Sequence, residues 1–423
     1  MQNAFPVRFA VALLAAPALF AADWSQVHGV NHDRKTAEKA PAKLADGALK
    51  KSWEIATGGG FSSFVTGGGR AYTATLTTID GRKRETVVAV DRKTGKQLWA
   101  TPLAPAEYRN GGERGAPGNN GGDGPRSTPV FAGGRVFAFG GDFDLHALDA
   151  ASGKVLWSHH LLRDFGGKQI TWNGAASPLV LRDRVIVYGG GEGQSYLAFR
   201  ADTGAPIWKT GTDRPTHTTP ITVTLHGKEQ VLFMVARGLV SLDPADGKEL
   251  WHYPFPHVTS TAASPVVWQD IVNVSAAYGV GGGACRVTRT GDKWDVTELW
   301  RVPGDRETAA HWSTAVVHEG FLYGCYGRAS ESFGTGPFKC IDIRTGKIQW
   351  SQPGFGPGQV IMAGGKLIAS TDAGVIAIID PKPDAYHEIA KADLIEGKVW
   401  STPIVSDGQL LLRSTTHGVC YEL

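Results

Sequence analysis

A short string that ends in tryptophan recurs along the chain. Its clearest copy is Ala89–Trp99, which reads AVDRKTGKQLW. Related strings end at Trp157, Trp208, Trp251 and Trp350, and when Trp300 is counted between the last two, the step between successive tryptophans is about 43 to 58 residues. Self-similarity at this spacing is typical of propellers and other repeat arrays. The repeat therefore favours one ring of similar units over several independent domains.

Each repeat shows the same order of patterns. A step rich in Ser, Thr and Ala leads into proline, as in SerThrPro at 127–129 and AlaSerPro at 176–178. An apolar strand, a glycine or Asp turn and a second strand follow, and a third strand alternates, as in Leu145–Asp149. A tight turn then leads into the strand that carries the tryptophan. Four short antiparallel strands in each unit predict a propeller blade.

The turn before each tryptophan has a physical explanation. Gly95 can adopt a positive φ at little cost, and Asp91 can accept hydrogen bonds from the backbone amides ahead of it. Trp99 is then expected to dock between neighbouring blades. Burial of an indole removes roughly 200 Å² from water, an upper-bound gain near 5 kcal/mol. We therefore interpret the repeated tryptophans as structural.

Counting the units predicts an all-β, eight-bladed propeller over residues 23–423. The unit after Trp350 is degenerate, because Tyr386–Ile395 replaces its tryptophan strand. The last unit begins at Ser401 and has only three strands, and the strand around Trp53 can supply the fourth. This pairing of the two chain ends would close the ring and remove a free sheet edge. The outer strands are marked by Trp53, Trp99, Trp157, Trp208, Trp251, Trp300 and Trp350.

The N-terminus resembles an export signal over residues 1–22. Arg8 precedes the apolar stretch Phe9–Phe20, and cleavage is expected after Ala18 or Ala22. The alternative is a buried or membrane-anchoring helix, although the stretch is short for a membrane span. The net charge of +3 is small and dispersed, which argues against a nucleic-acid surface. We expect a periplasmic or secreted protein without a stable membrane anchor.

The four cysteines suit an oxidising compartment. Cys325 and Cys340 flank the turn Gly327–Gly336, and we expect a hairpin to place them opposite each other. They are expected to form either a disulfide or two free buried thiols. Cys285 and Cys420 lie in strands of other repeats, and no Cys/His metal spacing exists.

The signature AxDxxTGKxxW, unbroken at Ala89–Trp99, resembles the tryptophan-docking motif of quinoprotein dehydrogenases and their relatives. The chain from about Trp24 to Leu423 is similar to exported PQQ-like β-propeller repeat proteins. Further similar stretches are DWSQVHGVNHD at 23–33, GGGFSSFV at 58–65, LLRDFGG at 161–167 and ARGLVSLDP at 236–244. The resemblance implies the eight-bladed fold. It says less about activity, because catalytic and non-catalytic propellers share the motif.

The resemblance implies two different kinds of function. Dehydrogenases of the group hold pyrroloquinoline quinone (PQQ) and calcium in the central funnel, with a tryptophan on one face of the quinone and a disulfide of adjacent cysteines on the other. No cysteines are adjacent here, and no acidic cluster with an evident calcium pattern occurs. A relative of the second kind is the propeller scaffold of the outer-membrane β-barrel assembly machine, which binds proteins. It carries a lipid-attachment cysteine that this sequence lacks.

Residues just before each Ser/Thr-Pro step should line one rim of the central channel, where propellers usually bind ligands. Arg126 can pair with a carboxylate, the tryptophans can stack on a flat ring or a sugar face, and the histidines can serve as acid, base or metal ligands. The candidate cofactor- or ligand-binding residues are Arg126, Trp172, Asn173, His217, His311, Trp312 and Trp400. Ser62, Ser63, Thr261 and Gln359 occupy equivalent positions.

A structural role is the alternative for each of these side chains, because inner strands are crowded and their polar groups often satisfy buried backbone. The long segment Glu107–Gly124, just before Arg126, is either a flexible lid over the rim or a glycine-rich excursion. Our first functional hypothesis is an exported binding or scaffold protein that holds a protein, small molecule or sugar. The alternative is a PQQ-dependent oxidoreductase that acts on alcohols or sugars.

Overall fold

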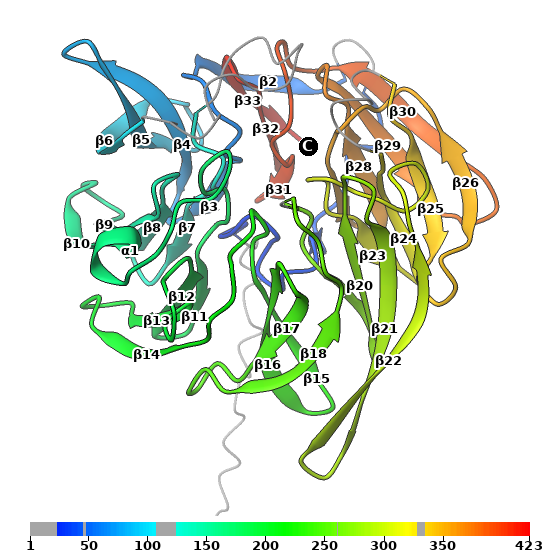
Figure 1. Ribbon diagram of the computed structural model, residues 1–423. Helices are drawn as coiled ribbons and strands as arrows, with labels where there is room; N and C mark the ends of the chain where they lie inside the picture. Colours follow the sequence, from blue (N-terminus) through cyan, green and yellow to red (C-terminus); the bar gives the residue numbers. More distant parts are fainter. Residues whose placement is uncertain (1–22, 45–47, 107–123, 260, 328–334) are drawn as a thin grey trace, which may run out of the picture.

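The computed structural model describes residues 23–44, 48–106, 124–259, 261–327 and 335–423. Within these residues the chain forms eight sheets, each built on four antiparallel strands, arranged as blades round a central axis (Figure 1). The predicted all-β, eight-bladed propeller is confirmed, and only about 1% of the chain is helical, in α1 (Leu161–Asp164). The expected signal segment 1–22, and the loop 107–124 except its last residue, lie outside the described residues.

Blades 1 to 4 follow one another along the chain. Blade 1 contains β3 (Val65–Gly67), β4 (Arg70–Ile79), β5 (Arg82–Asp91) and β6 (Gln97–Pro105). Blade 2 contains β7 (Val130–Ala132), β8 (Arg135–Phe139), β9 (Asp144–Asp149) and β10 (Val155–His160). Blade 3 contains β11 (Leu179–Leu181), β12 (Arg184–Tyr188), β13 (Tyr196–Arg200) and β14 (Pro206–Thr210). Blade 4 contains β15 (Ile221–Leu225), β16 (Lys228–Val235), β17 (Gly238–Leu242) and β18 (Glu249–Pro254).

Blades 5 to 8 complete the ring. Blade 5 contains β19 (Val266–Trp268), β20 (Ile271–Ala276), β21 (Gly281–Thr290) and β22 (Lys293–Val302). Blade 6 contains β23 (Val316–His318), β24 (Phe321–Cys325), β25 (Phe338–Asp342) and β26 (Ile348–Gln352). Blade 7 contains β27 (Val360–Ala363), β28 (Lys366–Ser370), β29 (Val375–Asp380) and β30 (His387–Asp393), and β1 (Lys35–Thr36) is added in parallel to β27. Blade 8 contains β31 (Ile404–Ser406), β32 (Gln409–Arg413), β33 (His417–Glu422) and β2 (Lys50–Ala56).

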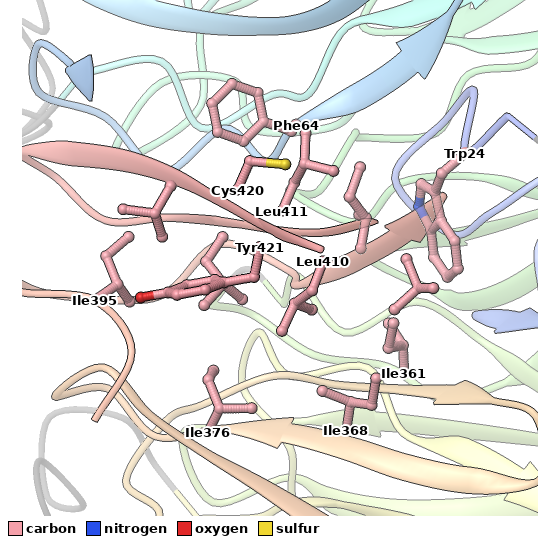
Figure 2. Packing of buried hydrophobic residues seen from close by; sticks show 14 of the residues in the cluster. Trp24, Phe64, Ile361, Ile368, Ile376, Ile395, Leu410, Leu411, Cys420 and Tyr421 are labelled. Carbon is pink, nitrogen blue, oxygen red and sulfur yellow. The ribbon is translucent and has the colours of Figure 1, made fainter. Parts of the chain in front are cut away.

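The predicted ring closure is confirmed, because β2 pairs with β33 and brings Trp53 opposite Cys420. Blade 8 is thus built from both ends of the chain, and Figure 1 shows β2 beside β33. The apolar core continues across the closure: Figure 2 shows Phe64, just before blade 1, in one cluster with Leu411 and Cys420 of blade 8. Closure therefore combines backbone pairing with continuous side-chain packing.

The outer-strand tryptophans dock each blade onto the next. In six of seven cases the indole Nε1 donates a hydrogen bond to a backbone carbonyl in the turn between the third and fourth strands of the following blade. The donor–acceptor pairs are Trp53–Arg92, Trp99–Ala150, Trp157–Ala201, Trp208–Pro244, Trp300–Ile343 and Trp350–Lys382, at 2.7 to 3.1 Å. The structural interpretation of the repeated tryptophans is consistent with these contacts. We call this contact the tryptophan dock.

Two features require glycine in this turn: its backbone angle, and the tryptophan dock, which leaves no room for a Cβ atom. Gly95 has φ +70°, and a Cβ atom there would lie 2.8 Å from the Trp53 ring of the neighbouring blade. Gly153 repeats the arrangement, since its Cβ would lie 2.6 Å from Trp99. Asp91 accepts hydrogen bonds from the amides of Lys93 and Thr94, as predicted. The turn glycine of one copy of the motif and the tryptophan of another therefore fit against each other at the contact between neighbouring blades.

Trp251 is the exception. The third and fourth strands of blade 5 continue into the long β21–β22 hairpin, which projects from the ring (Figure 1) and replaces the short turn. Trp251 Nε1 donates instead to Gln230 Oε1 within its own blade, at 2.6 Å. Trp294 of the hairpin packs against the apolar cluster of blades 4 and 5. The hairpin thus covers blade 4 where a turn would otherwise receive the indole.

The expectation that Cys325 and Cys340 face each other is wrong. In the β24–β25 pair, Cys325 lies opposite Phe338 and Cys340 lies opposite Tyr323, so the thiols are offset by two residues. All four cysteines are free and buried. Cys325 lies two residues before Gly327, whereas Cys340 lies four residues after Gly336, so pairing that is symmetric about the turn does not bring the two thiols together. The free-thiol alternative is the one that the structure supports.

Ser and Thr hydroxyls at the blade starts form a series of hydrogen bonds near the channel, which we call the hydroxyl belt. At five of the eight junctions between blades, a backbone amide of one blade donates to a hydroxyl oxygen of the next. These bonds are Thr402 N to Ser63 Oγ, Ser63 N to Thr128 Oγ1, Thr128 N to Ser177 Oγ, Ser177 N to Thr219 Oγ1 and Ser264 N to Thr314 Oγ1, at 2.7 to 3.0 Å. The belt satisfies buried amides that no strand pairing reaches.

We call the segment Trp24–Glu38 the strap. It contacts the ends of inner strands, on the face of the ring opposite the strand starts that carry the belt. Its blue trace lies near the middle of the ring in Figure 1. The Trp24 amide donates to Thr66 Oγ1, and the Thr66 amide donates to the Trp24 carbonyl. At the other end Glu38 accepts from the amides of Asp407 and Gly408 in blade 8. Figure 2 shows the Trp24 ring packed near Ile361 and Leu410. The strap therefore belongs to the folded ring.

The first prediction concerns closure. Deletion of residues 48–56 removes β2 and leaves β33 with an unpaired edge, so the ring should open and the melting temperature should fall sharply. Circular dichroism melting of the parent and the deletion variant measures the effect. A deletion variant as stable as the parent would contradict closure through β2.

The second prediction separates the dock from the backbone cost of its glycine. Gly95→Ala should cost about 1 kcal/mol for a left-handed backbone plus about 1 to 3 kcal/mol for overlap with Trp53. Gly69→Ala is the matched control, because Gly69 has φ +76° and its Cβ would meet nothing within 4 Å. Chemical unfolding of both variants measures the difference. Equal losses of stability would mean that the indole contact contributes little.

Candidate functional site

The predicted rim residues all lie at one mouth of the channel. Arg126, His217, Trp312 and Trp400 come one to three residues before the belt hydroxyl of their blade, and inner strands run away from that face. Loops joining second and third strands return to the same face, and one of them carries Tyr278, between β20 and β21. Topology therefore brings side chains from distant repeats to one end of the ring.

A chain of ring contacts runs round this mouth. The centroids of Trp312 and Trp400 lie 4.4 Å apart, and Phe61 stacks on Trp400 at 4.6 Å. In the other direction the contacts continue through His311 and Tyr278 at 4.6 to 6.2 Å. We call the set the collar: Phe61, Arg126, Trp172, His217, Tyr278, His311, Trp312 and Trp400.

Arg126 and backbone bonds complete the circuit. Arg126 Nη1 donates to the Trp172 carbonyl at 2.8 Å, and the Phe61 amide donates to the Pro125 carbonyl at 2.8 Å. The collar thereby draws residues from every blade except blade 7. The Arg126 and Trp172 side chains are both partly exposed. A cation and several ring faces are thus held together at the mouth.

Two collar aromatics occupy an unusual backbone conformation. Trp172 has φ +64° and Tyr278 has φ +63°, and their rings stack at 6.0 Å with an interplanar angle of 16°. Left-handed backbone is costly for bulky residues and clusters at ligand sites. Asn173, at φ +59°, supports the turn by donating from Nδ2 to Asp142 Oδ1 at 2.8 Å. This turn places the Trp172 ring against Tyr278 of blade 5.

His217 is buried beside this turn. Burial and the neighbouring Arg126 charge lower the pKa of His217 to about 3. Its imidazole is therefore neutral over the physiological range and cannot act there as a proton donor of the imidazolium type. Its ring lies 6.2 Å from the Trp172 ring, which makes packing its most evident structural contribution.

A second cation lies over the closest aromatic pair. The Lys398 ammonium is 4.8 Å from the centroid of the Trp400 ring, and burial lowers the pKa of Lys398 although Asp372 partly offsets this effect. Trp312 Nε1 donates to the Pro357 carbonyl at 3.3 Å. We add Lys398 to the collar, which then carries two basic side chains, Arg126 and Lys398, on different blades.

The structure brings six of the seven candidate residues into the collar. The seventh, Asn173, lies directly beneath Trp172 and faces Asp142 rather than the other rings. Sequence reasoning missed Phe61, Tyr278 and Lys398. Phe61 and Lys398 precede residues that were selected, and Tyr278 lies in a loop between second and third strands that the search of strand starts did not include.

A calcium–quinone centre of the dehydrogenase type does not fit the described residues. Among them no group of three His, Cys, Asp or Glu side chains could hold a metal ion. Nearby Asp142 is bonded to Asn173 and Gln169. The stacking rings and cations suit a flat, carboxylated molecule, but the described residues do not supply the calcium ligands or the adjacent cysteines. No helix in the described part of the chain is long and apolar enough to cross a membrane.

A family model described as outer membrane protein assembly factor BamB, named PQQ_2, matches residues 83–324. This is more than half of the chain. The chain belongs to this PQQ_2 family of propellers. The resemblance to PQQ-like repeat proteins is thereby confirmed. A comparison with curated proteins gave no significant match.

Solved propellers of similar fold include dehydrogenases. Quinohemoprotein alcohol dehydrogenase from Comamonas testosteroni is 15% identical with a TM-score of 0.66, over 95% of this chain and 80% of that chain. The enzyme ADHIIG from Pseudomonas putida HK5 is 13% identical with the same TM-score and coverage. A europium-containing methanol dehydrogenase is 14% identical with a TM-score of 0.52, over 94% and 90%. These similarities establish the fold of the PQQ_2 propeller and leave its chemistry to its own residues.

The third prediction tests the electrostatics of the collar. Because the folded pKa of His217 lies below the unfolded value, its contribution to stability is complete above pH 6.5 and is lost as pH falls toward 3. Nuclear magnetic resonance of histidine-labelled protein should show no titration of His217 between pH 5 and 8. His217→Gln assigns the signal, and Arg126→Ala should raise the pKa. A midpoint near 6.5 in the parent would overturn the described burial.

Proposed function

We propose that this PQQ_2 propeller is an exported binding protein whose collar holds a small ligand that combines a flat ring or sugar face with a carboxylate. The observation that carries this proposal is the Trp312–Trp400 pair, at 4.4 Å, in one collar with Arg126 and Lys398. Aromatic faces favour flat or sugar surfaces, and guanidinium groups favour carboxylates.

Two further features support a binding role. Left-handed Trp172 and Tyr278 represent local strain at the same mouth. The collar also draws on seven of the eight blades, so a ligand there would contact residues that only the closed ring assembles. Periplasmic or secreted location, after removal of residues 1–22, belongs to this proposal. A protein partner on the outer faces is compatible with the family description and would not compete with the collar.

A PQQ-dependent oxidoreductase that acts on alcohols or sugars is the second candidate. The rings and cations of the collar favour it, since PQQ is flat and carboxylated. The described residues do not assemble a calcium site, which argues against the dehydrogenase type of centre. PQQ is therefore included among the test ligands, with and without calcium.

The fourth prediction is a titration of the mature protein with D-glucuronate, D-glucose, and PQQ with calcium, followed by tryptophan fluorescence and melting temperature. A carboxylated ligand should give a saturable signal and raise the melting temperature. Loss of a charged hydrogen bond costs about 1.5 to 3 kcal/mol, so Arg126→Ala should weaken binding roughly ten- to a hundredfold. Trp312→Ala should also weaken it.

Trp294→Ala is the control, because this partly buried tryptophan lies on the β21–β22 hairpin away from the collar. It should leave binding unchanged. Ligand binding that is unaffected by both Arg126→Ala and Trp312→Ala would place the site elsewhere. Binding of PQQ alone among the ligands, with dye reduction in the presence of an alcohol or sugar, would favour the oxidoreductase.

A further inference from the structure

The hydroxyl belt is interrupted at blade 7, and a residue from the strap fills the gap. Blade 7 begins with Gln359 and Val360, where most blades have a Ser or Thr hydroxyl. Arg34 of the strap enters at this point from the opposite face, and its side chain is only 2% exposed. A segment outside the repeats thus replaces a missing part of the repeat.

The Arg34 guanidinium binds both sides of the interruption. Its Nε donates to the Val360 carbonyl at 2.8 Å, and its Nη2 donates to Gln359 Oε1 at 3.1 Å and to Thr402 Oγ1 at 3.2 Å. The planar fork of arginine suits such simultaneous contacts, whereas the single ammonium of lysine does not. Arg34 therefore links the start of blade 7 to the start of blade 8.

Both linked segments lead directly to the collar. Gln359 Nε2 donates to the Trp312 carbonyl at 3.4 Å, and the Gln359 amide is held by Ser370 Oγ at 3.1 Å. Thr402 lies two residues after Trp400. Two separate paths thus lead from Arg34 to the closest tryptophan pair in the collar. One passes through the Gln359 side chain to Trp312, and the other passes through Thr402 and along the backbone to Trp400.

The strap also holds Arg34 from the far side of the channel. Arg34 Nη1 donates to His28 Nδ1 at 3.2 Å, so His28 carries its proton on Nε2 and donates to Ser264 Oγ at 2.8 Å. Ser264 Oγ in turn donates to the Thr219 carbonyl at 2.8 Å. The donor and acceptor roles agree along the whole path. The Arg34–His28 pair therefore bridges blades 7 and 8 to blades 4 and 5.

We infer that Arg34 is a positioning residue for the collar: it sets the relative placement of Trp312 and Trp400 through Gln359 and Thr402, and so couples the strap on one face to the ligand site on the other. The effect of Arg34 on ligand binding rests on the proposed function. The placement of the two rings does not, because it is a property of the protein without ligand. The inference assigns the strap a role beyond covering one face.

Circular dichroism of the full mature protein tests the placement. Two indoles in contact give an exciton couplet in the far ultraviolet, whose amplitude falls steeply with separation and changes with angle. Trp312→Phe defines the part of the signal that belongs to this pair. Arg34→Met and Gln359→Leu should each remove most of that part, and Arg34→Lys should not rescue it. The double variant should lose no more than either single variant, because both act on one path.

Arg92→Met is the matched control. Arg92 is a buried arginine that links blades 1 and 8 by donating to Ser406 Oγ and to the Asp407 carboxylate, with no bond to Gln359 or Thr402. It should lower the melting temperature and keep the couplet. Gln359→Leu leaves the other bonds of Arg34 in place, so it reports on the path even if Arg34→Met does not fold.

The outcomes separate this inference from the proposed function. Loss of the couplet in Arg34→Met and Gln359→Leu, but not in Arg92→Met, supports positioning whether or not any ligand binds. An unchanged couplet in folded Gln359→Leu overturns it, even if D-glucuronate or PQQ binds the parent. Where a ligand does bind, Gln359→Leu should weaken its affinity without contacting it, and equal affinity would also contradict the coupling.

Discussion

The contact between an indole and the turn of the next blade is the interaction on which the rest of the structure depends. Except at Trp251, each copy of the motif carries both halves of it: a tryptophan that donates, and a glycine turn that accepts. The tryptophan of a blade bonds to the turn of the next blade and not to its own turn, so the motif stabilises the fold only when neighbouring blades are assembled in a ring. The pair of Trp53 and Gly95 shows this most directly, because it joins the last blade to the first.

Repetition explains why the fold was predictable and why part of the site was not. The dock and the Ser/Thr-Pro step recur, so their positions could be read from the sequence, and the rim residues followed from counting back from each step. Tyr278, Arg34 and His28 have no counterpart in other repeats. Apart from the bond between Arg34 and His28, the partners named for them are 33 to 368 residues away in sequence, and only the closed ring brings them together.

The error over Cys325 and Cys340 has a different cause. Cys325 lies two residues before Gly327, whereas Cys340 lies four residues after Gly336, so the two cysteines are not equally far from the turn. Pairing that is symmetric about the turn puts Phe338 opposite Cys325, and this is the register of β24 and β25. Counting residues from each end of the turn was therefore sufficient to predict that the two thiols do not meet.

The belt and the collar together show how a structural repeat can carry a specific site. Belt hydroxyls satisfy backbone amides and are interchangeable between Ser and Thr, so they leave the residue before them free to vary. The residue two positions before the hydroxyl lies at the mouth, and in this chain these variable positions hold Arg126, Trp312 and Trp400. Where the belt itself fails, at Gln359, a non-repeating arginine completes it: Arg34 bonds to Thr402 in the Trp400 segment and reaches Trp312 through Gln359. The residues that do not follow the repeat are therefore concentrated along the channel, in the collar and at Arg34. This is the physical reason to look there both for a ligand site and for the residue that positions its side chains.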